Sequence, residues 1–251
     1  MSDGIQQFQE KVCELINLIV SKERESVNQA ADLMAQTIVD DKLIHVIGTG
    51  GHSNMGAWEM FSRAGGLAAI NAILDPGTSL QYGARRSSAI ERTPGYGIAV
   101  LKAYDITDGI LIIVNAYGIN AMTIDTALEA KRRDLPTIGI TSREFSEQIP
   151  ANHPARHPTG KNLCDIVDVH VDCHMPYGDS VVKIEGLEAT VAPVSTIVNS
   201  FAAQLLVTRT AEKLIEKGIN PPIWISGNVP GGDEANLKLR KKYPPNRFAF
   251  G

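Results

Sequence analysis

Three glycines, a histidine and a serine follow one another at the end of a short apolar run. The apolar run is KLIHVIG at 42–48, and the residues from 48 onward read GTGGHSN. Glycines allow a tight turn and a close backbone approach to a ligand, and the unpaired N–H groups that start a following helix attract anions. Gly50, Gly51 and Ser53 are therefore predicted to bind an anion or a polar ligand. An ordinary strand-to-helix turn would explain the glycines equally well.

Two further groups have the composition of a binding site. Glu91 and Arg92 are predicted to clamp an anion or a polyol, because a guanidinium can make bidentate hydrogen bonds. A surface salt link would explain the same pair. His170, Asp172 and His174 would share one face of a strand, which suits zinc. The chain is expected to leave that strand before the third residue, so we predict no metal and no cofactor, with zinc kept as an alternative.

Composition narrows the class of protein. The chain has 251 residues, of which 43% are apolar and 21% charged, with a net charge of -4. That length suits one large α/β domain or two small ones, and that charge gives no general attraction to nucleic acid. The apolar runs are too short to span a bilayer, and the polar start does not resemble a signal peptide. With three cysteines and no paired motif, the protein is expected to be cytoplasmic, with reduced thiols.

The hydrophobic pattern predicts alternating strands and helices. Residues 5–39 have helical spacing and predict one long helix or two, with a break near 21–25. The predicted strands are 43–48, 67–74, 109–115, 136–142 and 166–172. The predicted helices are 53–64, 97–104, 119–132 and 191–218, and 75–96 is predicted to be mainly loop. Strands that are apolar on both faces and separated by helices favour a parallel sheet covered on both sides, with a ligand beyond the carboxyl ends of the strands.

The glycine loop and several later motifs together resemble the SIS (sugar isomerase) domain, a family that binds phosphosugars. The motifs, in order over roughly 40–250, are GTGGHSNMGAWEMFSRAGGLAAINAIL, DGILIIVNAYGIN, RHPTGKNLCDIVDVHVD, PYGDSVV, VAPVSTIVNSF and ISGNVPGGDEANLKL. The resemblance is strongest to uncharacterised stand-alone single-SIS proteins. It implies a three-layer, flavodoxin-like α/β fold, in which helices flank a five-stranded parallel sheet, and a homodimer or homotetramer. It places a single SIS domain at 41–251, after an N-terminal helical segment, 1–40, that packs on the domain or on a dimer partner.

The resemblance also implies where a phosphate would lie. SIS domains hold it with hydroxyls and amides of the first glycine loop, of a second glycine motif and of a Ser/Thr pair near the last long helix. The matching residues here are Ser53, Asn115, Tyr117, Gly118, Asn120, Ser195 and Thr196. The first loop has one extra glycine, and the second motif lacks two of the usual hydroxyls. The ligand is therefore predicted to be a sugar phosphate, with a free sugar, a polyol or a sugar acid as alternatives.

The expected chemistry is an aldose–ketose interconversion through an enediol(ate), as in SIS isomerases. Proton transfer between adjacent carbons needs a well-placed carboxylate, and a histidine can open the ring or relay protons. Glu188 or Glu59 is the predicted base and His52 the helper, although Glu59 could instead pair with Arg63 at i+4.

Two other activities fit the same residues. An SIS-type etherase or lyase would also need one carboxylate, and a non-catalytic sensor would need only the binding loop. The N-terminal segment lacks a basic recognition helix, so the predicted partner is a small sugar or sugar phosphate, with no nucleic acid and no membrane.

Overall fold

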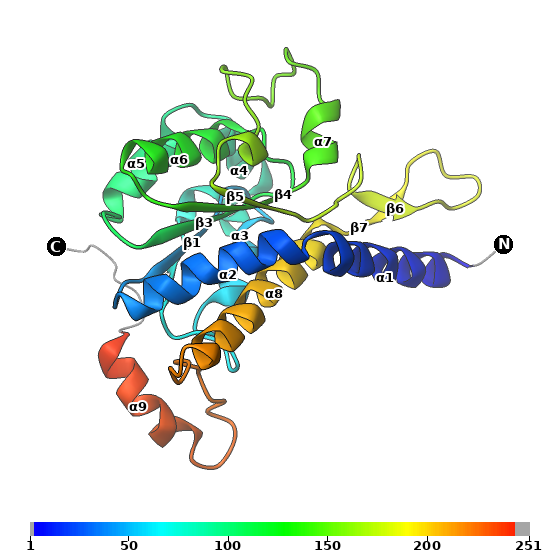
Figure 1. Cartoon of the computed structure of the whole chain (residues 1–251). Helices are drawn as coiled ribbons and strands as arrows, with labels where there is room; N and C mark the ends of the chain where they lie inside the picture. The colour runs from blue at the N-terminus through cyan, green and yellow to red at the C-terminus, as the bar shows by residue number, and fades with distance from the viewer. Residues whose placement is uncertain (1–2, 244–251) are drawn as a thin grey trace.

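A central sheet of five parallel strands organises the chain, which the computed structural model describes over residues 3–243 (Figure 1). The strand order is β2-β1-β3-β4-β5. The strands are β1 (Ile44–Gly48), β2 (Ile70–Ile73), β3 (Ile110–Val114), β4 (Thr137–Thr141) and β5 (Val169–Asp172). Every residue of the first four is buried, as expected for strands covered on both faces. The predicted three-layer, flavodoxin-like fold is confirmed.

Helices cover both faces of this sheet. The longer helices are α1 (Gly4–Lys22), α2 (Arg24–Val39), α4 (Ala84–Glu91), α5 (Tyr96–Ala103), α6 (Ala121–Arg132), α8 (Ser195–Glu216) and α9 (Gly232–Lys242). The shorter ones are α3 (Asn54–Met60), α7 (Arg143–Gln148) and the 3-10 turns η1 (Pro76–Thr78), η2 (Leu80–Tyr82) and η3 (Leu163–Asp165). Alternate residues of β3 face opposite layers: Ile112 packs with α2 and α8, whereas Leu111 and Ile113 pack with α5 and α6. The sheet therefore separates two hydrophobic layers.

The N-terminal helices run along one side of the sheet and beyond it. The predicted break is confirmed at Glu23, which ends α1 and begins α2. Helix α2 packs on α8 and on the sheet, while α1 packs on the start of α8 and on β6 (Ser180–Val182). Strand β6 pairs with β7 (Val191–Pro193) in a separate antiparallel hairpin. This hairpin and α1 project together away from the sheet, to the right in Figure 1.

Three predicted boundaries were wrong. The segment 75–96 contains α4, which begins after Gly83, a residue at φ 106°. The helix predicted to begin at 191 begins at Ser195, because 191–193 pair as β7. Helix α3 ends at Met60 rather than at 64, because Ser62 adopts a left-handed backbone at φ 47°. Residues 244–251 of the predicted SIS domain lie outside the described residues.

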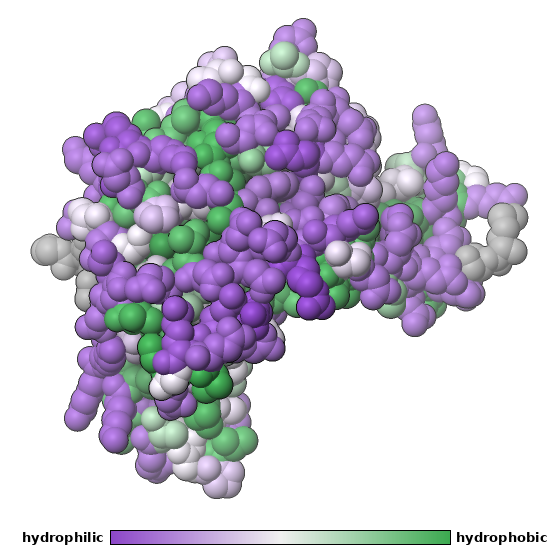
Figure 2. Space-filling model, in the orientation of Figure 1, coloured by the Kyte–Doolittle hydropathy of each residue, from purple (hydrophilic) through white to green (hydrophobic). Residues whose placement is uncertain are grey.

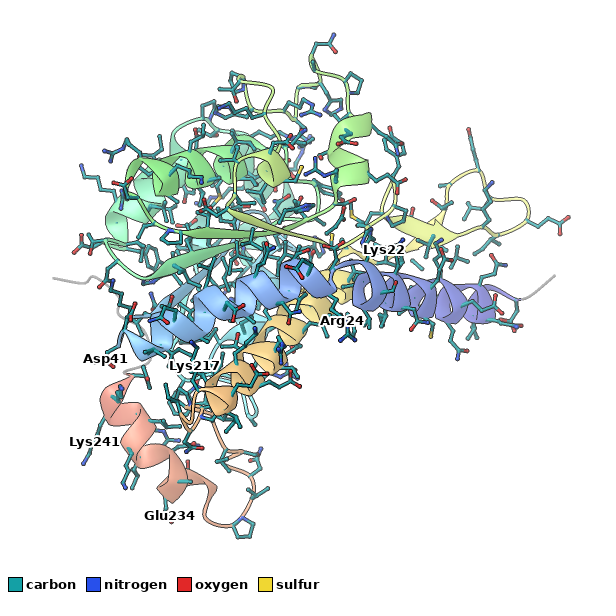
Figure 3. All side chains as sticks on the ribbon, in the orientation of Figure 1. Lys22, Arg24, Asp41, Lys217, Glu234 and Lys241 are labelled. Carbon is teal, nitrogen blue, oxygen red and sulfur yellow. The ribbon has the colours of Figure 1, made fainter. Side chains whose placement is uncertain are left out.

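The outer surface is largely hydrophilic over α1 and α2 (Figure 2). Lys22 and Arg24, on either side of the break at Glu23, carry their charges on this surface (Figure 3). Among residues 3–243, no helix has the length and apolar character needed to cross a membrane.

Candidate functional site

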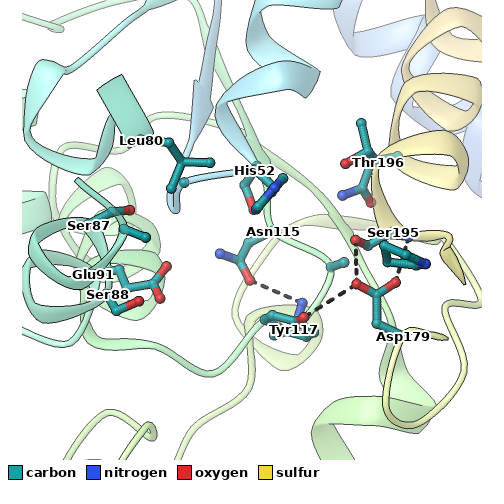
Figure 4. A pocket seen from close by; sticks show the side chains of 16 residues that line it. His52, Leu80, Ser87, Ser88, Glu91, Asn115, Tyr117, Asp179, Ser195 and Thr196 are labelled. Atoms are coloured by element: carbon teal, nitrogen blue, oxygen red, sulfur yellow. Dashed lines mark hydrogen bonds between the residues drawn. The ribbon is translucent and has the colours of Figure 1, made fainter. Parts of the chain in front are cut away.

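A cavity of about 320 Å³ lies beyond the carboxyl ends of β1 and β3, where the strand order reverses (Figure 4). This is the switch point at which open parallel sheets bind ligands. In Figure 4, α4 borders the cavity on one side and the start of α8 on the other. The lining residues are Gly51, His52, Ser53, Leu80, Ala84, Ser87, Ser88, Glu91, Asn115, Ala116, Tyr117, Asp179, Pro193, Ser195, Thr196 and Asn199.

The turn after β1 is folded so tightly that Gly48 leaves no room for a side chain and Gly50 leaves room for one only if the Glu91 carboxyl group moves. A Cβ added to Gly48 would lie 2.1 Å from the backbone oxygen of Ser53, and one added to Gly50 would lie 2.6 Å from Oε2 of Glu91. The helical hydrogen bonds of this turn begin with the N–H of Asn54, which donates to the Gly50 carbonyl. Within residues 3–243, the N–H groups of 50–53 donate to no protein acceptor. They remain available to a ligand.

Glu91 places its carboxyl group beside this turn. It is the last residue of α4, where its side chain is largely buried against Gly50. Desolvation raises the pKa of Glu91 to about 7, and the charge of Arg92 offsets only part of that shift. Glu91 can therefore both accept and donate a proton near neutral pH. Arg92 is exposed and lies outside the cavity, so the two predicted clamp residues are not brought together there.

The second glycine motif shapes the turn after β3. Asn115 Oδ1 accepts hydrogen bonds from the N–H groups of Tyr117 and Gly118, and its Nδ2 donates to the Thr49 carbonyl at 3.0 Å. The Asn115 side chain thus ties the two ligand-facing turns together. Gly118 has φ 66°, a left-handed value that suits glycine. Asn120 is buried at the start of α6 and does not line the cavity.

The N-terminus of α8 is already capped by a carboxylate. Asp179 Oδ1 accepts hydrogen bonds from the N–H groups of Val194 (2.9 Å) and Ser195 (2.7 Å), and the Ser195 hydroxyl donates to Oδ2 at 2.8 Å. The Tyr117 hydroxyl donates to the same oxygen at 3.4 Å. Burial, followed by the nearby Asp179 charge, raises the pKa of Tyr117 to about 12. Of the predicted Ser/Thr pair, the Ser195 hydroxyl is committed to Asp179, and Thr196 lines the cavity.

The two carboxylates predicted as bases lie elsewhere. Glu59 forms an ion pair with Arg63 at 2.5 Å and accepts a hydrogen bond from Gln204 at 3.0 Å. Glu188 is exposed on the loop that joins β6 to β7. Neither side chain lines the cavity, whereas His52 does.

The sequence reasoning missed several lining positions, among them Leu80, Ser87, Ser88, Asp179 and Asn199. Ser87, Ser88 and Leu80 fall in the segment predicted to be mainly loop, so the face shared by Ser87 and Glu91 at i+4 could not be recognised. Asn199 lies one turn after Ser195, and its buried Oδ1 has no hydrogen-bond partner within residues 3–243. The spacing of four residues between Ser195 and Asn199 could have placed Asn199 on the same face of the helix. The charged carboxyl groups of the lining are Glu91 and Asp179, and no lysine or arginine is among the lining residues.

The histidines considered for zinc have other partners. His170 Nε2 lies 3.0 Å from the Thr141 carbonyl oxygen, and His174 Nε2 lies 3.0 Å from Glu23 Oε1. The hydrogen bond to Glu23 is the main reason that the pKa of His174 is raised. Residues 3–243 contain no group of three or more side chains arranged to hold a metal ion.

Comparison with known proteins gives consistent matches. A family model described as the SIS domain matches residues 7–142, which is more than half of the chain. A UPF0309 protein of Caldanaerobacter subterraneus is 37% identical over 238 residues, which cover 93% of this chain and 95% of that protein. A phosphoheptose isomerase from Francisella tularensis has a similar fold, with a TM-score of 0.53 at 14% identity over 84% of this chain and 100% of its own. The Vibrio vulnificus NanR protein complexed with ManNAc-6P gives a TM-score of 0.50 at 14% identity, over 87% and 66% of the two chains.

Proposed function

The chain belongs to the SIS domain family, and on that premise we propose that it is a sugar isomerase acting on a phosphosugar or a closely related polar sugar derivative. The observation that carries this proposal is the position of Glu91. Its carboxyl group lies in the cavity beside Gly50, with a pKa raised to about 7. A general base with a pKa near the working pH can take a proton from one carbon and return it to the next.

The N–H groups of the first turn can stabilise the negative charge that forms on the substrate. The carbonyl oxygen of the open-chain sugar accepts hydrogen bonds from the N–H groups of 50–53. Glu91 removes the proton from the adjacent carbon, and the same N–H groups stabilise the negative charge on the enediolate oxygen. Glu91 then returns the proton to the former carbonyl carbon while the hydroxyl proton on the adjacent carbon passes to the enediolate oxygen, which exchanges aldose and ketose. His52, which lines the cavity, assists ring opening.

Glu91 takes this role because the alternatives are less well placed. The carboxylate of Glu59 is engaged by Arg63 and Gln204, and its side chain does not line the cavity. Glu188 is exposed to solvent outside the cavity. We therefore replace both predicted bases with Glu91 in the proposed mechanism.

The remaining lining favours a polyhydroxylated ligand. Ser88 and Thr196 line the cavity with hydroxyl groups that can pair with sugar hydroxyls, whereas the Ser87 hydroxyl donates to the Thr78 carbonyl at 2.7 Å. A phosphate would be bound by N–H groups and hydroxyls, since the lining contains no lysine or arginine. The similarity to a protein complexed with ManNAc-6P supports a sugar phosphate among the ligands to test first.

Deuterium exchange tests the isomerase without knowledge of the product. Sugar phosphates, with ManNAc-6P among them, are incubated with the protein in D₂O, and NMR follows loss of the proton next to the carbonyl. Glu91→Gln is expected to reduce exchange by about 10²–10⁴-fold while ligand binding is kept. The matched control, Glu188→Gln, makes the same change on the exposed hairpin and should exchange at the wild-type rate. Full exchange in Glu91→Gln would remove Glu91 from the mechanism.

A sugar-phosphate sensor is the second candidate, and its support is the similarity to NanR. A sensor would bind a sugar phosphate in the same cavity, as seen by titration calorimetry, without deuterium entering the sugar. Exchange in any tested sugar, abolished by Glu91→Gln, would exclude a purely binding role.

A further inference from the structure

A second cavity, of about 270 Å³, lies next to the first. It is lined by residues from α3 and from the segment that runs from β2 to η2. Leu80 lines the first cavity, whereas its chain neighbours Ser79 and Gln81 line the second. Ser53 and Asn54 divide in the same way. The two cavities therefore adjoin at two short stretches of chain, 53–54 and 79–81.

Two large aromatic side chains line this second cavity from different elements. Trp58 projects from α3 and is 55% exposed, and Tyr82 ends η2 and is 56% exposed. The Arg86 guanidinium lies 5.7 Å from the centre of the Tyr82 ring, so one face of that ring already has a partner. When an aromatic ring has one face exposed to water, covering that face with a flat apolar surface is favourable.

A buried amide also lines the cavity without a full set of partners. Asn54 is 5% exposed, and its Nδ2 donates to the Thr78 hydroxyl at 3.1 Å. Its Oδ1 has no hydrogen-bond partner within residues 3–243. Leaving a buried carbonyl oxygen unpaired is unfavourable, so a donor from a ligand would correct the deficit. The sequence reasoning did not single out this residue.

The other polar groups of the cavity include a single acidic side chain. Asp75 is the only ionisable carboxyl group in the lining, and its Oδ2 already accepts hydrogen bonds from the Gly77 N–H and the Tyr96 hydroxyl, both at 2.8 Å. Gln81 adds a neutral amide. The lining thus combines aromatic faces with amide groups and one carboxyl group, and it offers no cation of its own to an anionic ligand.

We propose that the second cavity binds the ring of a neutral saccharide. The apolar C–H face of the ring packs on Trp58 and Tyr82, and a ring hydroxyl donates to Oδ1 of Asn54. Aromatic surface with a few convergent polar groups is the usual chemistry of a small-molecule site. The ring is either a second unit of the ligand in the first cavity or a separate saccharide. The site stands on its own residues, so its failure would leave the function proposed for Glu91 untouched.

Tryptophan fluorescence tests the site directly. The chain has two tryptophans, so Trp224→Phe leaves Trp58 as the single reporter. Titration with methyl β-D-glucopyranoside, and with cellobiose, is expected to give a saturable blue shift of Trp58 emission. Tyr82→Ala in the same background should weaken binding roughly tenfold. The matched control is Tyr177→Ala, which removes a tyrosine that is 57% exposed and outside this cavity, and it should leave the affinity unchanged.

The variant Asn54→Ala provides a second test of the saccharide site. It should weaken binding without changing the emission of the free protein, with circular dichroism as the check on folding. No saturable shift up to the solubility of either sugar, or equal affinity in the Tyr82 and Tyr177 variants, would overturn the proposal. Stronger binding of glucose 6-phosphate than of the glucoside would contradict the proposal that the ligand is a neutral saccharide. A shift that follows protein concentration without sugar, with a doubled mass in light scattering, would show that a second copy covers Trp58 instead.

The two sugars also distinguish the two sources of the ring. A Cβ added to Gly51 would lie 2.7 Å from Leu80 and 2.9 Å from Ser87, so Gly51→Ala narrows the first cavity. If one ligand spans both cavities, cellobiose will bind more tightly than the glucoside and lose that advantage in Gly51→Ala. If the ring belongs to a separate saccharide, both sugars will bind alike in both proteins.

Discussion

Asp179 and Ser195 are joined by two hydrogen bonds, one from the Ser195 N–H at 2.7 Å and one from its hydroxyl at 2.8 Å. A carboxylate in this position satisfies N–H groups that the helix cannot satisfy itself, and it is stabilised by the positive end of the helix. The pair therefore joins the base of the β6–β7 hairpin to the longest helix. It also leaves the N–H groups of Val194 and Ser195 with a protein acceptor, so these two are not open to an anionic ligand.

Asp179→Ala is expected to destabilise the protein by about 0.5–2 kcal/mol, the usual cost of losing an N-cap side chain. Urea unfolding followed by circular dichroism measures the difference. Asp233→Ala is the control, since Asp233 is an exposed residue in the first turn of α9 that pairs only with Arg240 among residues 3–243. An equal loss of stability in both variants would show that the cap contributes nothing specific.

Glu91→Gln is expected to raise the melting temperature at pH 8 but not at pH 4. Burial raises the pKa of Glu91 from 4.5 to about 7, so the folded state binds a proton that the unfolded state releases between those values. Stability contributed by this group therefore falls as pH rises from about 4.5 to 7. Glutamine removes the cost of a buried charge. Thermal unfolding of both proteins across this range measures the effect, and parallel curves would argue against a raised pKa.

The rate of deuterium exchange is expected to rise with pH through about 7 and then level off. The proposed base acts only when ionised, and the pKa of Glu91 is about 7. Initial rates measured by NMR between pH 5 and 9 give the profile. A profile that is flat across neutral pH would point to a base other than Glu91.

Gly50→Ala is expected to abolish exchange while the protein stays folded. The added Cβ would lie 2.6 Å from Oε2 of Glu91 and would displace that carboxyl group. Adding Glu91→Gln to the variant should cause little further loss, because both changes act on one group. Gly4→Ala, where the added atom meets only Val182 at 3.5 Å, serves as the control. Additive losses of exchange rate in the double variant would show that Gly50 and Glu91 act independently.

His174→Gln is expected to lower stability at pH 6 but not at pH 9. Glu23 raises the pKa of His174 by accepting its hydrogen bond. The stabilisation is fully present below the unfolded value of 6.5 and is lost as pH rises through the higher folded value. The pKa of Glu23 is lowered: burial opposes this shift, and the bonds from His174 and Asp172 produce it. Urea midpoints at both pH values test the link, and an equal change at both would leave His174 with a packing role only.

The sheet was predictable from sequence, whereas the chemistry of the cavity was only partly so. Strands such as β3 are aliphatic on both faces, and a short aliphatic run of this kind can be recognised in the sequence as a buried strand. Helix α4 did not, because Arg85, Arg86, Ser87 and Ser88 give it no clear apolar face. Glu91 was recognised as a ligand residue but not as a base, since its raised pKa comes from burial by segments distant in sequence. Asp179 was overlooked because its role depends on a hairpin that brings it to Ser195.

The packing of α2 on α8 has a consequence for biosynthesis. Helix α2 is translated well before its partner α8, because α2 spans 24–39 and α8 spans 195–216. The apolar face of α2, which includes Ala30, Met34 and Ile38, therefore cannot be covered by α8 until α8 has been translated. Contacts between such distant segments slow folding, and the exposed face is a natural target for chaperones during that delay.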